Sequence, residues 1–186
     1  DGKGKINGSP ALDLTTSLDE VLDVAEIVKE YPNQLSTSKN VMSQVLKDMA
    51  ALANSNKLGL IVGSHASSWL NSIYTRAFGQ DGSGTDNTML IPDMVEALKS
   101  VGKTFDFILF DACYMGTIEV AYTFREVANY QISSVMEVPA YGFPYENFMG
   151  NLYKGTVDNY QQVCQAYVDY YKTLYSEGDV AWGTVA

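Results

Sequence analysis

Two residues whose side chains can together attack a carbonyl group stand at similar places in this sequence. His65 is the only histidine, Cys113 is one of two cysteines, and each comes soon after a short apolar run. A cysteine thiolate is a strong nucleophile, and a neighbouring imidazole can take the thiol proton and later return it to a leaving group. The pair therefore predicts nucleophilic catalysis by a cysteine–histidine dyad.

Each residue also has an ordinary structural interpretation. A lone cysteine after a strand is most often a small buried hydrophobe, and a lone histidine is most often a satisfied structural or surface group. The case for chemistry is stronger than for either residue alone because both follow strand ends, where ligands gather in parallel α/β sheets, and the structural interpretation stays open at this point. A helix expected to begin almost directly after Cys113 would favour the thiolate through its dipole. The backbone amides of Cys113 and Ala66 could then hold an oxyanion.

The elements that must position these residues predict an α/β protein with a mainly parallel sheet flanked by helices. Residues 11–31 are ambiguous, with strands favoured over an amphipathic helix. Residues 66–88 are expected to form a long exposed loop with room for a short hairpin. Apolar spacing predicts helices over 39–54, after Pro92, from near Cys113 to Asn129, and over 159–175. Apolar runs predict strands over 58–62, 105–110, 131–135 and 180–186.

Composition removes several classes of function. The chain has 186 residues and a formal net charge of −10, with scattered lysines, whereas a nucleic-acid binder needs a basic stripe. Two cysteines make no disulfide framework, and a single histidine disfavours a zinc site. No apolar run approaches the ~20 residues of a membrane span. No glycine-rich phosphate-binding motif follows a strand, which disfavours a nucleotide-binding domain.

Local sequence around the two residues resembles the clostripain family of cysteine peptidases. The segment Phe105–Gly116, FDFILFDACYMG, followed by Ile118–Tyr122, is similar to the nucleophile segment of that family. The segment Leu58–Trp69, LGLIVGSHASSW, is similar to its histidine segment, and Gly142–Tyr145 to its downstream pocket loop. The similarity runs from about Ser36 to Tyr175, and the first 35 residues match little.

The resemblance implies a caspase-like α/β fold, a mainly parallel sheet in a three-layer sandwich. Residues 36–186 would form the peptidase domain, truncated at both ends, and residues 1–35 a lead-in with peripheral strands. Cys113 would be the nucleophile and His65 the general base and acid of a hydrolase that cuts peptide bonds and requires no cofactor. The alternative is a catalytically silent relative that serves as a binding or regulatory module.

The resemblance also implies a primary specificity pocket that selects Arg or Lys through acidic residues. Asp111 matches one acidic position, with a cap on the following helix as its equal alternative. The other acidic position falls at Tyr141, and Glu137 lies close enough in sequence to substitute. Ala66 stands where a glycine commonly follows the histidine, and it still offers an N–H group. The preference at the cleaved bond therefore stays open.

Four further expectations follow from the resemblance. Self-cleavage between the catalytic segments would fall at Arg76–Ala77, with an ordinary exposed arginine as the alternative. Some family members need calcium, but Asp81–Asn87 lacks the closing glutamate of an EF-hand loop, so we interpret it as an acidic turn and assign no metal ligands. The expected partners are protein or peptide substrates and another chain or segment of the same precursor. The expected location is extracellular, periplasmic or attached to a bacterial surface, although this chain carries no signal-peptide pattern.

Overall fold

The computed structural model describes residues 28–32, 34–53, 55–67, 77–79, 81 and 87–176. The chain divides into two compact units, 1–34 and 35–186. In the first unit, residues 28–32 and 34 are described and belong to no helix or strand. The strand expected over 180–186 and most of the strand region expected over 11–31 lie outside the described residues, and the described residues 28–31 form no strand. The following account concerns the second unit.

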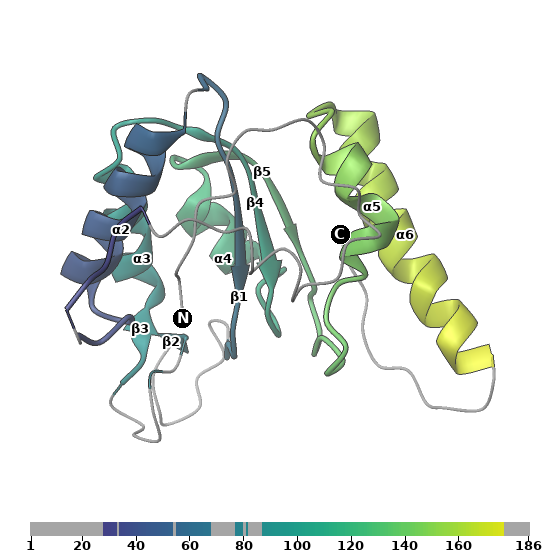
Figure 1. Ribbon diagram of the computed structural model, residues 1–186. Coiled ribbons are helices and arrows are strands. Elements are labelled where there is room, and N and C mark those ends of the chain that lie inside the picture. The colour runs from purple at the N-terminus through teal and green to yellow at the C-terminus, as the bar shows by residue number, and fades with distance from the viewer. Residues whose placement is uncertain are drawn as a thin grey trace. The chain divides into compact units, whose positions relative to one another are not determined.

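A parallel sheet lies at the centre of this unit (Figure 1). Its described strands stand in the order β1-β4-β5, and both pairings are parallel. Their bounds are β1 Gly59–Gly63, β4 Phe105–Asp111 and β5 Ala128–Ser133. In the β1–β4 register, Gly59 pairs with Phe107 and Gly63 with Asp111, so these two strands end at the same level.

Helices cover both faces of the sheet (Figure 1). One face carries α2 (Lys39–Leu52), α3 (Ile91–Lys99) and α4 (Ile118–Phe124). The other face carries α5 (Tyr145–Leu152) and α6 (Val157–Ser176). The described residues therefore form the three-layer sandwich that the sequence predicts. Among them, no helix is long and apolar enough to cross a membrane.

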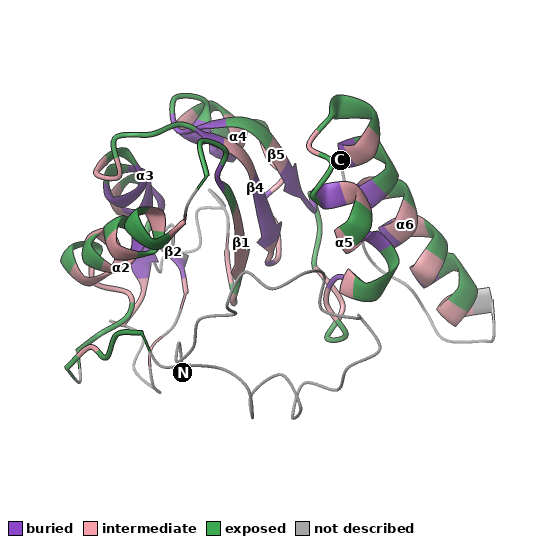
Figure 2. Ribbon diagram, turned by 45° about the horizontal axis from the view of Figure 1, so that its top comes forward, coloured by how far each residue is buried: buried purple, intermediate pink, exposed green. Residues whose placement is uncertain are grey.

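Strand β4 supplies both hydrophobic cores because its side chains alternate between the two faces. Ile108 and Phe110 pack towards α2, α3 and α4, whereas Phe107 and Leu109 pack towards α5 and α6. The Phe110 ring meets Phe124 edge to face, with 5.1 Å between ring centroids. In Figure 2 the buried residues of the helices lie on the sides that face the sheet.

The tyrosines of α6 form the packing face predicted for that helix. Tyr160, Tyr167 and Tyr171 are buried, and each belongs to the core beneath α5 and α6. Their rings also pack on one another, with 4.6 Å between the centroids of Tyr167 and Tyr171. Cys164 is half-buried on the same helix and packs against this core, as expected for a structural cysteine.

The segment after Cys113 differs from the prediction. A turn occupies residues 112–117, α4 ends at Phe124 instead of near Asn129, and β5 already begins at Ala128. The predicted apolar stripe is wrong at Ile118 and Tyr122, which are 77% and 64% exposed. These two residues are one helical turn apart, on the face opposite to Val120 and Phe124, which are buried.

Two further differences concern the connections. The region expected as an exposed loop with room for a short hairpin does hold a short antiparallel pair, β2 (Ala77–Phe78) with β3 (Met89–Leu90), but Phe78 and Met89 are buried in the core instead of exposed. Helix α5, which begins at the end of the segment Gly142–Tyr145, is not among the predicted helices. Phe148 and Leu152, one helical turn apart, bury its inner side.

Candidate active site

The parallel register brings Cys113 and His65 to one edge of the sheet. Gly63 of β1 pairs with Asp111 of β4, and the Ser64 N–H donates to the Asp111 carbonyl at 3.3 Å. Each candidate residue follows two positions beyond this last pair. Both line a cleft of about 420 Å³ at the carboxyl ends of the strands. The fold thus brings together the two residues that the sequence singles out, at the end of the sheet where α/β proteins bind ligands.

The loop after β5 forms the opposite wall of this cleft. Residues 138–142 all line it, and Tyr141 among them is 78% exposed. The hydroxyl of Tyr171 on α6 donates to the Gly142 carbonyl at 2.6 Å, which ties the wall to the tyrosine-rich layer. The wall therefore combines a fixed backbone with one freely exposed aromatic side chain at the cleft.

The turn that carries Cys113 is bonded to the segment after β5. Tyr114 adopts a positive φ of 61°, and its N–H donates to the Met136 carbonyl at 2.9 Å. The Gly116 N–H donates to the Ser134 carbonyl at 2.7 Å. The thiol itself is half-buried, and the Val138 N–H lies 3.4 Å from its sulfur.

These contacts replace the helix dipole that the sequence suggested. Because α4 begins only at Ile118, Cys113 does not stand at a helix N-terminus. The backbone of Val138 instead contacts the thiol, with its N–H as donor to the sulfur at 3.4 Å and its carbonyl as acceptor at 3.9 Å. A valine side chain has no polar group, so the sequence gives no indication that the backbone of Val138 contacts the cysteine.

The segment that carries His65 is fixed by its backbone and leaves the imidazole exposed. The His65 carbonyl accepts a hydrogen bond from the Gly79 N–H at 2.9 Å, and Ala66 forms an antiparallel bridge with Phe78. His65 is exposed and lines the cleft, whereas Ala66 is half-buried against the core and is not among the lining residues.

Asp111 lines the cleft and also anchors its wall. Its Oδ2 accepts hydrogen bonds from the Phe143 N–H at 3.2 Å and the Tyr145 hydroxyl at 2.8 Å. Burial and the bond to Asp111 raise the pKa of Tyr145 above its usual range, so this hydroxyl stays a donor. The alternative interpretation of Asp111 as a helix cap is wrong, because Thr117 is the N-cap of α4.

The other predicted site residues fall in different places. Glu137 is exposed, does not line the cleft, and accepts a hydrogen bond from the Tyr114 hydroxyl at 2.9 Å. Arg76 lies outside the described residues, and Ala77 is the first residue of β2. The Asp81 carboxylate accepts the Ser36 N–H at 2.6 Å. Within the described part of the chain, no group of three or more His, Cys, Asp or Glu is arranged to hold a metal ion.

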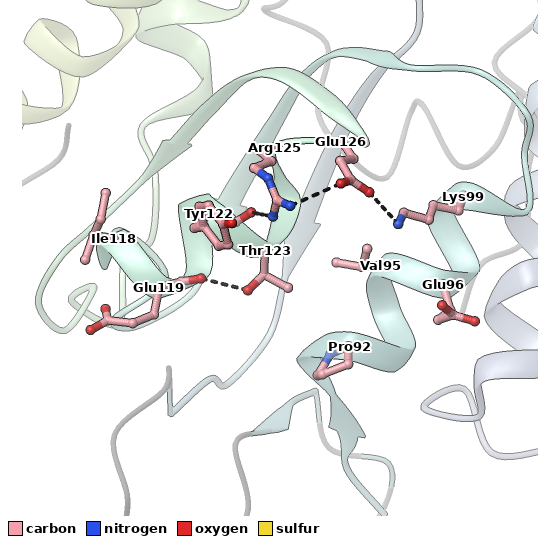
Figure 3. Close-up of a pocket in the computed structure, with 10 residues that line it drawn as sticks. All are labelled: Pro92, Val95, Glu96, Lys99, Ile118, Glu119, Tyr122, Thr123, Arg125 and Glu126. Carbon is pink, nitrogen blue, oxygen red and sulfur yellow. Dashed lines mark hydrogen bonds and ion pairs between the residues drawn. The ribbon is translucent and has the colours of Figure 1, made fainter.

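A second cleft, of about 670 Å³, lies between α3 and α4 (Figure 3). Ion pairs join Lys99 to Glu126 at 2.7 Å and Arg125 to Glu126 at 3.1 Å along its rim. The Arg125 guanidinium also stacks over the Tyr122 ring, 3.8 Å from its centroid. Its lining contains neither thiol nor imidazole, so the smaller cleft is the one equipped for nucleophilic chemistry.

Known proteins resemble this chain in sequence and in fold. The model of the clostripain family matches residues 6–184. A secreted C11 cysteine protease from Bacteroides thetaiotaomicron, solved with an irreversible peptide inhibitor, is 35% identical with a TM-score of 0.71, over 81% of this chain and 42% of that one. An inactive zymogen C11 protease from Parabacteroides distasonis is 34% identical with a TM-score of 0.65, over 80% of this chain and 40% of that one. Curated protein sequences give no match.

This chain therefore spans less than half the length of the solved structures that it resembles. Its mainly parallel sheet, flanked by helices on both faces, is the caspase-like fold of those proteases. Because the family model covers nearly all of the sequence, the protein belongs to the clostripain family.

Proposed function

We propose that this chain carries the catalytic core of a cysteine endopeptidase, with Cys113 as nucleophile and His65 as general base and acid. The observation that supports it most is the shared cleft, which a thiol and an imidazole line from adjacent strand ends in register. Both the family and the similar structures, which are cysteine proteases, favour this chemistry over a nucleophile of another kind.

In the proposed reaction, His65 takes the thiol proton as sulfur attacks the carbonyl carbon of the substrate. The tetrahedral oxyanion would be held by backbone N–H groups, for which the amides of Cys113 and Ala66 are the candidates. The protonated imidazole then gives its proton to the leaving amine, which leaves a thioester on Cys113. Water, deprotonated by His65, attacks the thioester, releases the carboxylic acid and restores the thiol.

For the residue before the cleaved bond, we propose a pocket made by Asp111 and Tyr141. A substrate Arg or Lys would meet the Asp111 carboxylate, which lines the cleft. That carboxylate already accepts two hydrogen bonds through Oδ2, and Tyr141 adds no charge. We therefore expect Arg and Lys to be preferred over apolar residues, but less strongly than in a pocket with two acidic side chains.

Maturation and location are proposed from the similar proteins. One of them is described as an inactive zymogen and two as secreted. We propose that this protein is likewise exported from a bacterial cell, and that self-cleavage occurs at Arg76–Ala77, directly before β2. Since the chain spans less than half of those proteins, another segment of the same precursor is a proposed partner. No cofactor is assigned to the hydrolysis, so we expect activity to persist when calcium is chelated.

Labelling with irreversible thiol-reactive peptidyl inhibitors, followed by mass mapping, tests the proposal on the full-length protein. We expect rapid modification of Cys113, loss of labelling in His65→Ala, and unchanged labelling in Cys164→Ala. Cys164 serves as the internal control, because burial raises the pKa of its thiol and slows its reaction. If Cys113 reacts no faster than a free thiol with any inhibitor, the peptidase assignment is wrong and a silent binding module is the better account.

A further inference from the structure

We propose that Tyr114 and Glu137 are a pair of positioning residues for the reaction, which hold the turn of Cys113 so that its thiol meets the Val138 N–H. The inference rests on the proposed peptidase function and adds residues to that site. It also gives Glu137 a different task from substrate binding, because its carboxylate would act through Tyr114 and never touch the substrate.

The turn needs such support because of its backbone conformation. Tyr114 has a φ of +61°, the left-handed region, and it is the one residue other than glycine with a positive φ among those described. A bulky aromatic residue rarely adopts this conformation, and such strain persists only where the surrounding structure holds it. Tyr114 directly follows Cys113, so its conformation sets the direction in which the chain leaves the nucleophile.

Three of the bonds that hold the turn reach one short segment, residues 134–137, and the Gln131 side chain on β5 adds another, to the Met115 carbonyl at 2.7 Å. The Tyr114 N–H donates to Met136 at 2.9 Å, and the Gly116 N–H donates to Ser134 at 2.7 Å. The Tyr114 hydroxyl donates to Glu137 Oε1 at 2.9 Å. The next residue along that segment, Val138, is the one whose N–H lies 3.4 Å from the Cys113 sulfur. Of the bonds between turn and segment, the one from Tyr114 to Glu137 joins two side chains, so substitution can remove it without altering the backbone.

The environment of Glu137 favours this task over direct contact with substrate. Glu137 is exposed and is not among the residues that line the cleft. Its carboxylate already accepts the tyrosine hydroxyl, and that bond raises the pKa of Tyr114. The hydroxyl therefore stays protonated, and stays a donor to Glu137, throughout the neutral range. Small displacements of a nucleophile strongly affect rates, because the reacting atoms must approach in a narrow range of geometry.

Steady-state kinetics of the full-length protein distinguish the two tasks. The variants are Tyr114→Phe, Glu137→Ala, their combination, and Glu137→Gln, whose amide oxygen can still accept the hydrogen bond. Each is measured on a peptide with Arg at the cleaved bond and on one with an apolar residue there. We expect Tyr114→Phe and Glu137→Ala to lower kcat by about tenfold on both peptides with little change in KM. The combined variant should lose no more than either single change, and Glu137→Gln should keep most of the activity.

Tyr153→Phe is the matched control, since Tyr153 directly follows α5, is 80% exposed and does not line the cleft of Cys113, and it should change nothing. Thermal unfolding of each variant separates loss of fold from loss of positioning. The proposal is wrong if Glu137→Gln loses as much activity as Glu137→Ala and if both losses occur only with the Arg peptide. That result would mean that the Glu137 carboxylate contacts the charge of the substrate. It is equally wrong if Tyr114→Phe keeps full activity.

A failure of the proposed function would look different, because the unaltered protein would then cleave no peptide at all. In that case the rate at which a small uncharged alkylating reagent modifies Cys113 still tests the positioning. Tyr114→Phe and Glu137→Ala should change this rate, and Glu137→Gln should leave it near that of the unaltered protein. Equal rates in all four proteins would overturn the inference.

Discussion

Asp111 joins the two walls of the cleft through a single carboxylate oxygen. Its Oδ2 accepts hydrogen bonds from Phe143 and Tyr145, and Gly142 passes directly over it. Gly142 has a φ of +69°, and a Cβ built there would lie 2.8 Å from that oxygen. The loop can follow this path only because residue 142 has no side chain, so the wall of the cleft depends on a glycine and a carboxylate together.

Gly142→Ala is expected to abolish most peptide hydrolysis and to destabilise the fold. The control is Gly102→Ala, where φ is +72° and nothing lies within 4 Å of the new Cβ. Both variants carry the left-handed strain of alanine, roughly 1–2 kcal/mol, but only Gly142→Ala displaces Asp111. Denaturant unfolding and kcat/KM measure the difference. Equal losses of stability with full activity in both variants would show that the contact with Asp111 does not matter.

At this scale the sequence points to the two cleft residues, Cys113 and His65, better than to the contacts that support them. Cys113 and His65 could be singled out because their types are rare here and both follow apolar runs. The anchoring role of Asp111 and the hydrogen bond from Val138 depend on loops that meet only in the folded chain. Tyr114 gives no sign of its left-handed backbone, because a tyrosine does not favour that conformation. Gly116 and Gly142 were the available signals, since glycine often marks a close approach of backbones.

Among the elements, the turn between β4 and α4 deviates most from expectation. The sequence predicts a helix directly after Cys113, but residues 112–117 form a turn that crosses the end of β5 instead. A Cβ on Gly116 would lie 2.7 Å from the carbonyl carbon of Ser134 and 2.8 Å from the Val135 nitrogen. The two backbones are therefore too close for any side chain at position 116.

Gly116→Ala is expected to destabilise the protein by about 2–4 kcal/mol, because the new methyl group clashes with backbone atoms and a rotamer change cannot relieve the clash. The matched change Gly150→Ala lies in α5, where nothing approaches within 4 Å, and should stabilise the protein by up to about 1 kcal/mol. Chemical denaturation of both variants tests this contrast in sign. A neutral Gly116→Ala would mean that the turn can move away from Ser134 at little cost.

Elements with an apolar pattern bounded by clear turn residues were predictable, and those with ambiguous boundaries were not. The pattern gives α2, α3, α6, β1 and β4 with small errors at their ends. The predicted end of helix α4 is too late because Val127 and Ala128 extend its apolar pattern. In the structure Val127 directly precedes β5, and Ala128 is the first residue of that strand. Helix α5 was missed because glycine and proline just before it indicated a loop, although Phe148 and Leu152 carried its helical spacing.

Across the whole unit, the two helical layers differ in their chemistry. The core beneath α2, α3 and α4 is built from aliphatic residues and phenylalanine, whereas the core beneath α5 and α6 holds Tyr160, Tyr167 and Tyr171. The Tyr167 hydroxyl is buried and has no hydrogen-bond partner among the described residues. The sequence predicted both the layers and the tyrosine packing face. The sequence could not predict which tyrosine hydroxyls form hydrogen bonds, because those bonds depend on the position of the loop at Gly142.

This layer predicts how stability depends on alkaline pH. Burial raises the pKa of Tyr145, Tyr167 and Tyr171 above the ordinary value of about 10. Above that value the unfolded chain releases protons that the folded chain retains, so the free energy of unfolding decreases as pH rises. The stabilisation contributed by these three tyrosines in their neutral form is fully present below about pH 10. It is lost as pH increases through their raised pKa values.

Unfolding measured at a series of pH values, with tyrosinate absorbance followed in parallel, tests this dependence. We expect the decrease above about pH 10 to become shallower in Tyr167→Phe, by up to about 1.4 kcal/mol for each pH unit. Because its hydroxyl has no described partner, this variant should lose little stability at neutral pH. A slope unchanged by Tyr167→Phe would assign the alkaline loss to other groups.

The order of elements along the chain has a consequence for synthesis. The sheet and its first helical layer lie within residues 39–133, whereas the second layer lies within 145–176. A chain emerges from the ribosome with its N-terminus first, and a domain generally folds as a unit. His65 and Cys113 thus leave the ribosome well before Tyr171, whose hydroxyl fixes the Gly142 carbonyl in the opposite wall. During synthesis His65 and Cys113 are therefore present before the opposite wall of the cleft is complete, so substrate binding requires the completed polypeptide.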